Sequence, residues 1–592
     1  MAGQPLSFSG KIWRPRTPVL AVHRQLAATC GLHPLFAAIL ADRGLNDQAG
    51  VDMFLHPRLQ QLLDPLLLRD MDKAVARLVQ AVEGGESLAV FGDYDVDGVT
   101  SSALLVRYFR ALGMAIRVYI PDRLTEGYGP NPAAMRTLAA EGVRVVVTVD
   151  CGATAFEALT EARQVGLDVI VTDHHQVRDA LPPALALINP NRPDDPFPHK
   201  NMAGVGVAFY LLMALNRGLR QRGWFHDGRP EPDLKQWLDL VAIGTIADVA
   251  GLTGLNRILV AHGLRMTSES GPVGLQALKQ TARLSGRLRA GQVAFQLGPR
   301  INAGGRLNRG MLGVALLTTD DVDQARLLAD ELEGYNRERQ TLEEQMLREA
   351  LAAIEAAGGV SRRFGLVVAG SGWHPGVIGV VASRLAERLY RPVIVIALDD
   401  EQGQGKGSGR SIPGINLLAA VESTASLLLA FGGHRAAAGL SLAAHHLPAF
   451  TEAFDQAIRA QCRDELFEPV LPVDGTVALA EVNRSLVGHL ERLHPFGQGN
   501  PEPVLVLDDV RIMEARLLKE RHVKCLLADR QDNVLEAIAF QAWPGPLGAG
   551  LLGAARRVDV AGTCMINSYR DRESVQMVLK DARPVQQSGK GE

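Results

Sequence analysis

The chain has 592 residues, of which 47% are hydrophobic and 21% are charged, and its formal net charge is −3. This length is too great for a single hydrophobic core and predicts three or four domains. The sequence has no apolar run near the length of a bilayer span and no signal-peptide hydrophobic segment at its N-terminus, so an integral membrane protein and a secreted protein are both disfavoured. The nearly neutral charge does not by itself indicate a nucleic-acid-binding protein.

The cysteines are scattered and form no CxxC pair: they are Cys30, Cys151, Cys462, Cys525 and Cys564. This spacing predicts neither a disulfide framework nor a structural zinc site. It indicates a reducing compartment, and we expect the protein to be cytoplasmic.

The first regular pattern begins after a mixed, mostly helical-looking region, residues 1–85, which carries no recognisable chemistry. Strands are then expected at 87–91, 115–120, 143–150 and 167–175, with helices at 100–113 and 154–166. Apolar, β-branched strands that alternate with helices are typical of a parallel α/β sheet covered on both faces.

Acidic residues and histidines recur where these strands end: Asp93, Asp95, Asp97, Asp150 and the triplet Asp173, His174 and His175. Open parallel sheets bind ligands at the carboxyl ends of their strands. Alternate residues of an extended segment point the same way, so Asp93, Asp95 and Asp97 aim at one place if the strand geometry persists. Asp248 is a further carboxylate at the end of an apolar stretch.

A single aspartate at a strand end is more often a helix N-cap or part of a turn than a ligand. The whole set on one sheet edge is different, because several carboxylates and two histidines would repel strongly without a cation between them. Oxygen-rich ligation with some imidazole suits Mg²⁺ or Mn²⁺, and Mn²⁺ is the better match to histidine. A pair of such ions is suited to in-line phosphoryl chemistry.

The second half of the chain predicts three further parts. Residues 321–358 contain no proline and predict one long helix, broken or bent near Gly334, that bridges two domains. A second α/β unit follows and ends in two glycine-rich segments, 403–411 and 431–439. After Pro469 the pattern becomes short strands with turns, which predicts a small β-barrel.

Several segments now resemble known motifs. "DYDVDG" from Asp93, "TVDCG", "TDHH" and "GTIAD" resemble the DHH phosphoesterase superfamily, and "WHPGVIGVVASRL", "SGRSIPGINLL" and "FGGHRAAAG" resemble its DHHA1 substrate domain. "RLHPFGQGNPEPV", followed by a β module, is similar to the RecJ branch of single-strand-specific exonucleases. The resemblance extends from about Leu88 to the C-terminus.

The resemblance implies a multidomain α/β fold with five segments. They are an N-terminal helical region (1–85), a parallel α/β DHH catalytic domain (86–320), a bridging helix (321–358), a smaller α/β DHHA1 substrate-binding domain (359–465) and an OB-like barrel (466–592).

The resemblance also implies a two-ion site of Mn²⁺ or Mg²⁺. The positions that match the family's metal ligands are Asp93, Asp95, Asp97, Asp150, His174 and Asp248. Asp150 is the candidate bridging carboxylate, and His175 matches a histidine that helps with metal or substrate phosphate. Smaller members of the superfamily often carry a histidine where this chain has Phe91. Asp93 is expected to replace that histidine as a ligand. The assignment of ligands to each ion therefore stays open.

Nucleic-acid contacts are expected outside the metal site. Residues 270–319 contain no Asp or Glu and form a possible phosphate track, with these basic residues: Lys279, Arg283, Arg287, Arg289, Arg300, Arg306 and Arg309. Arg306 resembles the family's arginine at the scissile phosphate, with Gly304 and Gly305 bringing backbone close to the anion. Arg123, Ser408, Arg410 and His434 resemble a pocket for a terminal phosphate. In the barrel region, Phe496, Phe540 and Trp543 could stack on bases, while Lys519, Arg521 and Lys524 contact phosphates.

The preferred function is an exonuclease that degrades single-stranded DNA from the 5′ end in recombination and repair. A DHH phosphatase acting on pyrophosphate, cyclic dinucleotides or very short oligonucleotides is disfavoured by the added barrel and long helix. A DNA-binding scaffold with a dead site is disfavoured because every catalytic-looking acid and histidine is present. Single-stranded DNA is the expected partner of a monomer, with a helicase and a single-strand-binding protein as further candidates.

Overall fold

The structure is a computed structural model that describes residues 6–16, 19–122, 125–177, 180–226, 228–267, 271–306, 310–360, 363–462, 467–553, 557–569 and 572–585. The chain divides into two compact units. The first comprises Met1–Asn46, Glu338–Arg492 and Pro503–Glu592, and the second comprises Asp47–Arg337 and Leu493–Glu502. We call these the barrel-bearing unit and the DHH unit.

The DHH unit contains a five-stranded parallel sheet in the order β3-β2-β4-β5-β6. Its strands are β2 (Leu88–Gly92), β3 (Ile116–Tyr119), β4 (Val145–Val149), β5 (Asp168–Thr172) and β6 (Ala186–Ile188). Every residue of β2 and β4 is buried. The predicted parallel α/β sheet is therefore confirmed.

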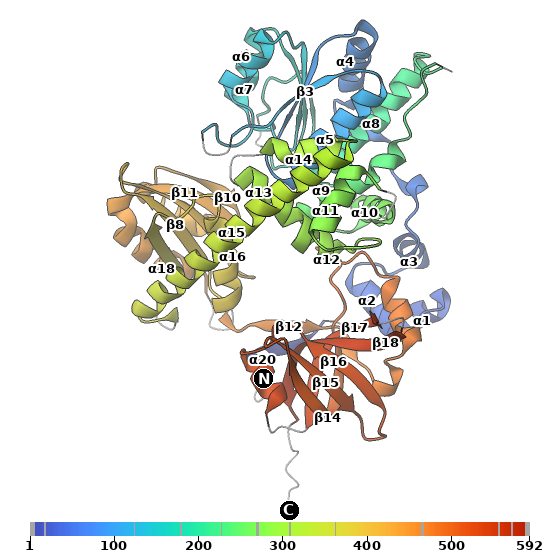
Figure 1. Cartoon of the computed structure of the whole chain (residues 1–592), viewed down its shortest axis with the longest axis vertical. Helices are drawn as coiled ribbons and strands as arrows, with labels where there is room; N and C mark the ends of the chain where they lie inside the picture. The colour runs from blue at the N-terminus through green and yellow to red at the C-terminus, as the bar shows by residue number, and fades with distance from the viewer. Residues whose placement is uncertain are drawn as a thin grey trace, which may run out of the picture. The chain divides into compact units, whose positions relative to one another are not determined.

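Helices cover both faces of this sheet (Figure 1). Val90 and Val147 pack into the core on one face, and Phe91 and Val146 pack into the other. The first face is covered by α4 (Met71–Gly84), α5 (Val96–Ala111) and α8 (Gly204–Gln221), and the second by α6 (Pro132–Ala140) and α7 (Phe156–Gln164). The alternation of apolar side chains along each strand thus builds two separate cores.

A group of further helices completes the DHH unit. They are α3 (Gln48–Leu55), α9 (Leu238–Ala247), α10 (Gly254–Met266), α11 (Val273–Thr281), α12 (Ala290–Gln292), the π-helical segment η4 (Val293–Leu297), α13 (Gly298–Arg306) and α14 (Gly310–Thr318). The long helix α15 (Val322–Ala356) is shared by the two units: its residues up to Arg337 belong to the DHH unit, and those from Glu338 onward belong to the barrel-bearing unit. It continues through Gly334, so the expected break there is absent.

The barrel-bearing unit contains a mixed sheet in the order β10-β11-β9-β8-β7, in which only β7 and β8 are parallel. Its strands are β7 (Leu366–Ser371), β8 (Val393–Asp399), β9 (Gln404–Arg410), β10 (Ala430–His434) and β11 (Ala437–Ala443). Its helices are α16 (Ile378–Leu389), α17 (Leu417–Glu422) and α18 (Leu447–Gln461).

The C-terminal strands close into a barrel, as expected. Its strands are β14 (Leu505–Leu518), β15 (His522–Ala528), β16 (Val534–Ala539), β17 (Arg557–Tyr569) and β18 (Arg572–Pro584), and the short β13 (Gly475–Thr476) adds to β14. The barrel closes because β14 pairs with β17 as well as with β15. Two helices, α19 (Arg484–Glu491) and α20 (Pro546–Leu552), accompany it.

Residues 1–85 do not form one region. The described part of Met1–Asn46 contains α1 (Ala21–Cys30), α2 (Pro34–Asp42) and a strand, β1 (Ile12–Pro15), and groups with the barrel, whereas residues from Asp47 onward group with the DHH unit. Strand β1 pairs in parallel with β12 (Val470–Val473). The indole N–H of Trp13 donates a 3.0 Å hydrogen bond to Oδ2 of the buried Asp581 in β18. The N-terminal strand thus packs with the barrel, through its pairing with β12 and its hydrogen bond to β18.

Residues 493–502 return from the barrel region to the DHH unit. Arg257 in α10 is 2% exposed and donates hydrogen bonds to the carbonyl oxygens of Phe54 (2.8 Å), Leu493 (3.0 Å) and His494 (2.8 Å). A buried guanidinium needs such acceptors, so this segment completes the fold of the DHH unit. In the described part of the chain, no helix is long and apolar enough to cross a membrane.

Candidate active site

The loop between β2 and α5 carries three of the predicted ligands. Asp93 follows Gly92 at the end of β2, and Asp95 is the N-cap of α5. The Asp95 carboxylate accepts hydrogen bonds from the backbone N–H groups of Asp97 (2.9 Å) and Gly98 (3.1 Å). The strand geometry therefore does not persist, and the expected alignment of three carboxylates along a strand is wrong. The N-cap role turns the chain into a helix, so Asp97 lies in the first helical turn.

Two helices, α8 and α9, pack against Asp97, which is 1% exposed. At the start of α8, the N–H groups of Gly204 and Val205 donate to Oδ2 (2.6 Å) and Oδ1 (2.9 Å) of Asp97. A Cβ on Gly204 would lie 2.9 Å from Cβ of Asp150 and 3.0 Å from Oδ2 of Asp97. A Cβ on Gly244 in α9 would lie 3.0 Å from Oδ1 of Asp97. Only glycine leaves room for this carboxylate at either position.

Asp150 follows β4 with a left-handed backbone (φ 60°), a conformation that is uncommon outside glycine. The hydroxyl of Tyr128 donates a 3.1 Å hydrogen bond to its carbonyl oxygen. The Asp150 side chain is buried, and its Oδ1 lies 3.1 Å from Nε2 of His174. The turn after β4 thus directs this carboxylate toward the histidine of the neighbouring strand end.

The Asp173 carboxylate organises the turn after β5. It accepts hydrogen bonds from the N–H groups of Ala153 (2.9 Å), His174 (2.7 Å) and His175 (3.1 Å). Its Oδ1 also lies 2.7 Å from Nδ1 of His175. Asp173 therefore fixes the ring of His175.

The predicted ligands come together in three groups. Within each group, one ligand atom per residue lies within 4.8 Å of the others; the groups are Asp93, Asp95 and Asp150; Asp97, His174 and Asp248; and Asp150, His174 and His175. All six predicted metal positions and His175 thus converge on one edge of the sheet. Asp150 and His174 each belong to two groups.

The carboxylates oppose one another's ionisation. Burial raises the pKa of Asp97 to about 7, and the charge of Asp95 adds to the effect. Burial and the charge of Asp97 raise the pKa of Asp150 well above its ordinary value, and the same two causes raise the pKa of Asp248 to about 9. Added positive charge would relieve this repulsion.

The two histidines differ in protonation. Burial, together with the charge of His175, lowers the pKa of His174 to about 4, so its ring is neutral and suited to bind a metal. Burial opposes protonation of His175, but the hydrogen bond and charge of Asp173 outweigh it and raise the pKa to about 9. His175 is therefore cationic at neutral pH.

Unsatisfied buried atoms indicate that the site fits divalent cations. Within the described residues, Oδ1 of Asp150 and Nε2 of His174 are buried and, although they lie 3.1 Å apart, neither makes a hydrogen bond. Such atoms are costly unless a partner is supplied. An oxygen-rich set with one neutral imidazole is the donor chemistry that Mn²⁺ and Mg²⁺ accept.

Helix α13 packs on the β2–α5 loop and ends at Arg306. Oδ1 of Asn302 accepts a 3.2 Å hydrogen bond from the N–H of Val96, and a Cβ on Gly305 would lie 2.2 Å from the carbonyl oxygen of Tyr94. The two glycines before Arg306 thus lie inside a helix. Within this helix, Gly305 allows close packing against the backbone of Tyr94.

The basic stretch is only partly available to a ligand. Nζ of the buried Lys279 donates to the carbonyl oxygens of Thr267 (2.6 Å) and Gly286 (2.7 Å), and Arg300 pairs with Glu333 at 2.8 Å. The expected phosphate track does not include these two side chains. The exposed side chains of the stretch are Arg283, Arg287 and Arg289, and Arg309 lies outside the described residues. Arg123, which is predicted to bind a terminal phosphate, also lies outside the described residues.

The glycine-rich segment around Ser408 is a central strand, β9, paired with β8 and β11. Its backbone groups serve these ladders, so its amides are not available to bind a phosphate. A Cβ on Gly407 would lie 2.7 Å from the Leu440 side chain, so the glycine makes room for the core.

Side chains remain as possible phosphate ligands on this sheet. Nη1 of Arg410 donates to Oγ of Ser408 at 3.2 Å, and a Cβ on Gly379 in α16 would lie 3.1 Å from that hydroxyl oxygen. Arg410 pairs with Ala437, which pairs with His434. Residues directly opposite one another share a face, so Ser408, Arg410 and His434 lie on one face of the sheet.

The three aromatic residues expected on the barrel do not all belong to the same unit. Phe496 belongs to residues 493–502, which group with the DHH unit by their contacts. Phe540 and Trp543 are 56% and 38% exposed, and the N–H of Trp543 donates to the carbonyl oxygen of Arg521 at 3.2 Å. Lys519 and Arg521 are exposed in the same turn, whereas Lys524 pairs with Glu536 at 2.8 Å.

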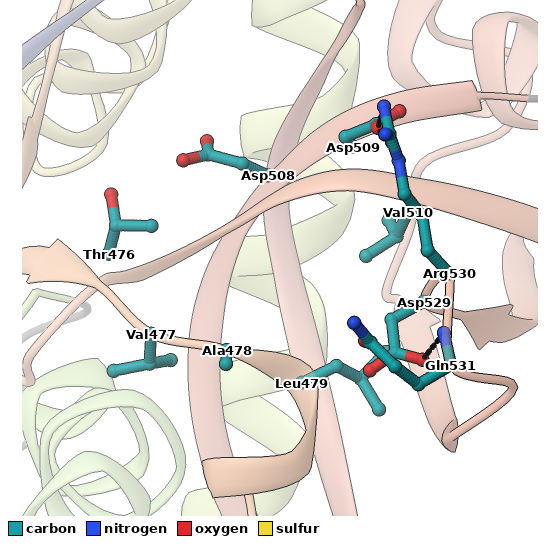
Figure 2. Close-up of a pocket in the computed structure, with 10 residues that line it drawn as sticks. All are labelled: Thr476, Val477, Ala478, Leu479, Asp508, Asp509, Val510, Asp529, Arg530 and Gln531. Carbon is teal, nitrogen blue, oxygen red and sulfur yellow. Dashed lines mark hydrogen bonds and ion pairs between the residues drawn. The ribbon is translucent and has the colours of Figure 1, made fainter.

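The barrel also carries a pocket of about 380 Å³ whose charged lining residues are mostly aspartates (Figure 2). Asp508, Asp509 and Asp529 line it together with Arg530, whose Nε donates to Asp509 at 2.8 Å. Figure 2 shows the Asp508 carboxylate pointing away from Arg530. Because its cation is already paired, this pocket is unsuited to a phosphodiester chain.

Sequence reasoning missed the residues that support the ligands. Gly204, at the start of α8, contacts Asp97, and Tyr128, in the segment between β3 and α6, contacts Asp150; nothing in the local pattern identifies either residue. The contact of Asp173 with the His175 ring could have been expected, because the two residues belong to the same Asp-His-His triplet.

Three parts of the chain match known families. The matches are to the DHH family, N-terminal domain, over residues 87–245, the DHHA1 domain over 363–460 and the RecJ OB domain over 473–581. They coincide with the parallel sheet, the mixed sheet and the barrel. This agreement supports the three-part architecture.

Individual proteins are similar over nearly the whole chain. The single-stranded-DNA-specific exonuclease RecJ of Dickeya dadantii (strain 3937) is 38% identical over 586 residues, covering 96% of this chain and 100% of the relative. The protein of the same name from Bacillus subtilis (strain 168) is 35% identical over 573 residues, covering 96% of this chain and 70% of the relative. The crystal structure of RecJ in complex with Mn²⁺ from Thermus thermophilus matches with a TM-score of 0.81 at 34% identity, covering 97% of this chain and 80% of that one.

Proposed function

The chain belongs to the RecJ family of single-stranded-DNA-specific exonucleases, and from this membership we propose that it degrades single-stranded DNA from the 5′ end and releases 5′-mononucleotides. It is a metal-dependent phosphodiester hydrolase of DNA recombination and repair. The observation that carries the proposal is the convergence of carboxylates and histidines in three groups at the carboxyl edge of the parallel sheet.

We assign the metal positions to two ions, Mn²⁺ or Mg²⁺. The proposed ligands are Asp93, Asp95, Asp97, Asp150, His174 and Asp248. Asp150 is the proposed bridging carboxylate, since it belongs to two of the three groups. When bound, such ions lower the pKa of an attacking water and stabilise charge on the leaving oxygen.

The chain's own residues then position the substrate. His175 is held by Asp173 in a cationic state, which suits an interaction with a phosphate oxygen. Arg306, at the end of the helix that packs on the β2–α5 loop, is the proposed contact to the scissile phosphate. Both side chains would stabilise negative charge as it develops on the phosphate.

Selection of the 5′ end is proposed to come from Ser408, Arg410, His434 and Arg123. A guanidinium beside a hydroxyl suits the extra charge of a terminal phosphate. The barrel, with Phe540 and Trp543 exposed, is a proposed second contact for the strand. We further propose a monomeric cytoplasmic enzyme that acts with a helicase and a single-strand-binding protein.

A degradation assay tests this function. The substrate is a long 5′-phosphorylated single strand, with a 5′-hydroxyl strand and a blunt duplex as controls, each incubated with and without Mn²⁺. We expect mononucleotides from the 5′-phosphorylated single strand only in the presence of metal. Rapid loss of the duplex, or products released from the 3′ end, would contradict the proposal.

A further inference from the structure

Phe295 is the most exposed large hydrophobic residue of the described chain, at 82%. It lies in the π-helical segment η4, between α12 and α13. Single exposed apolar residues are common on protein surfaces and need no special explanation. This one also lies in a π-helical turn, a feature that occurs frequently at functional sites.

The sequence on either side of Phe295 is basic. It lies within residues 270–319, which contain no Asp or Glu. The side chains of Arg287 and Arg289, shortly before η4, are exposed. An exposed aromatic ring among guanidinium groups suits a nucleic acid strand, because bases stack on rings while cations contact the phosphates.

Segment η4 is anchored beside the metal site. A Cβ on Gly298, three residues after Phe295, would lie 3.5 Å from Cβ of Ala247, which directly precedes Asp248. Seven residues after Phe295, Asn302 accepts the hydrogen bond from Val96, the first residue of α5. At about 1.5 Å per helical residue, Phe295 therefore lies about 10 Å along the helical segments from this contact.

A protein partner is a poorer fit to the ring. Interface cores are contiguous and depleted in charge. Phe295 instead has Gln292 and Gln296 as close neighbours in sequence, and exposed arginines precede it. An exposed ring in a segment of polar and basic residues matches a single nucleobase better than an apolar protein surface.

We propose that Phe295 stacks on a base of the single strand a few nucleotides from the cleaved phosphate, with the exposed arginines of residues 283–289 contacting the strand's backbone. This rests on the proposed function and adds to it a contact that recognises unpaired bases. A ring of this kind favours single strands, because the bases of a duplex are already stacked on one another.

Binding of two oligonucleotides tests the proposal. One carries normal bases and the other is abasic throughout, and both are measured by fluorescence anisotropy with Ca²⁺ in place of Mn²⁺ to suppress cleavage. We expect Phe295→Ala to weaken binding of the normal strand about 5- to 150-fold, the range for losing one stacked base. It should leave the abasic strand unaffected, and Phe295→Trp should restore affinity.

Leu327→Ala is the matched control, because Leu327 is 72% exposed on α15 in the same unit and is far less suited to stacking. It should bind both strands as the unchanged chain does. Equal losses on normal and abasic strands in Phe295→Ala, or no loss at all, would overturn the inference.

Hydrolysis of a small chromogenic phosphodiester with Mn²⁺ separates this result from the proposed function. Phe295→Ala should hydrolyse that compound at the unchanged rate. If the unchanged chain cannot hydrolyse it or degrade DNA, the proposed function fails, whatever the binding data show. If it can, and the variant binds normal strands unchanged, only the stacking contact fails.

Discussion

The backbone N–H of Gly204 donates a 2.6 Å hydrogen bond to Oδ2 of Asp97, a residue 107 positions earlier in the chain. The same glycine leaves no space for a Cβ beside Asp150. One backbone position at the start of α8 therefore sets the separation of two carboxylates. Supporting contacts of this kind commonly tune metal affinity as strongly as some ligands do.

Gly204→Ala should weaken Mn²⁺ binding by about 10- to 100-fold, since the new methyl group must displace Asp97 or Asp150. Isothermal titration of the metal-free protein with Mn²⁺ measures this directly. Gly206→Ala is the control on the same helix, because its Cβ would meet only the flexible Met202 side chain, 3.3 Å away. Unchanged Mn²⁺ affinity in Gly204→Ala would show that the glycine is not needed to position the carboxylates.

Asp150→Ala should abolish hydrolysis, because Asp150 belongs to two of the three ligand groups. Loss of an essential metal removes several kcal/mol of transition-state stabilisation, or roughly several powers of ten in rate. Steady-state cleavage of a labelled single strand in saturating Mn²⁺ measures the change, and single-strand binding should persist. Near-normal turnover would mean that the metal site is misassigned.

The metal-free protein should lose stability as the pH rises from about 6.5 to 9. The pKa values of Asp97, Asp248 and His175 are raised to about 7, 9 and 9 in the folded protein, above the ordinary values of about 3.9 and 6.5 for unfolded Asp and His. The folded state thus binds more protons than the unfolded state in this window, so the free energy of unfolding falls with pH. The lowered pKa of His174 acts the opposite way, but only below about 6.5.

Thermal unfolding in a chelator at several pH values measures this dependence, and added Mn²⁺ should raise the midpoint most at high pH. A midpoint that stays constant or climbs between pH 6.5 and 9 without metal would contradict the electrostatic account of the site.

Arg410→Ala should weaken binding of 5′-phosphorylated strands by roughly 1.5–3 kcal/mol, the value of one charge-assisted hydrogen bond. Strands with a 5′-hydroxyl should be affected less. Competition binding with the two strands measures the difference. Lys406→Ala, which removes an exposed charge from the same strand, is the control. Equal losses on both substrates would count against a terminal-phosphate role.

Arg257→Ala should reduce the free energy of unfolding of the DHH unit by about 3 kcal/mol or more, because several buried carbonyl groups lose their donor. Arg265→Ala, at an exposed position of the same helix, should have little effect. Chemical denaturation measures both.

For the same reason, removal of the chain from residue 470 onward should destabilise the DHH unit, since it takes residues 493–502 away. A truncated chain as stable as the full one would contradict this coupling.

Local pattern was enough to predict the parallel sheet, the small barrel and the candidate ligands. The apolar strands around Val90 and Val147 are buried because β-branched runs between helices have few other stable arrangements. The polar residues after them must then lie at one edge, since the carboxyl ends of parallel strands meet there. Asp93 and Asp150 could be nominated on that ground from the sequence alone, whereas Asp248 ends helix α9 and was, like His174, assigned to the metal through the resemblance to the DHH superfamily.

Glycine-rich segments were the weakest part of the sequence reading. Their glycines suggest backbone that approaches an anion, whereas the residues around Ser408 form a central strand and those before Arg306 form a helix. Glycine permits turns and close packing equally, and its sequence signal does not distinguish them. The neighbouring side chain that fills the missing Cβ, such as Leu440 at Gly407, decides which applies.

The sequence by itself determined which residues end each strand and which chemistry they share. Only the tertiary structure decided that α8 holds Asp97, that β1 supports the barrel and that residues 493–502 complete the DHH unit. The physical reason is that periodicity records which face of an element is buried, and is silent on which distant element buries it. Contacts such as that of Gly204 with Asp97 arise from packing between elements, so they become visible only when the chain is folded.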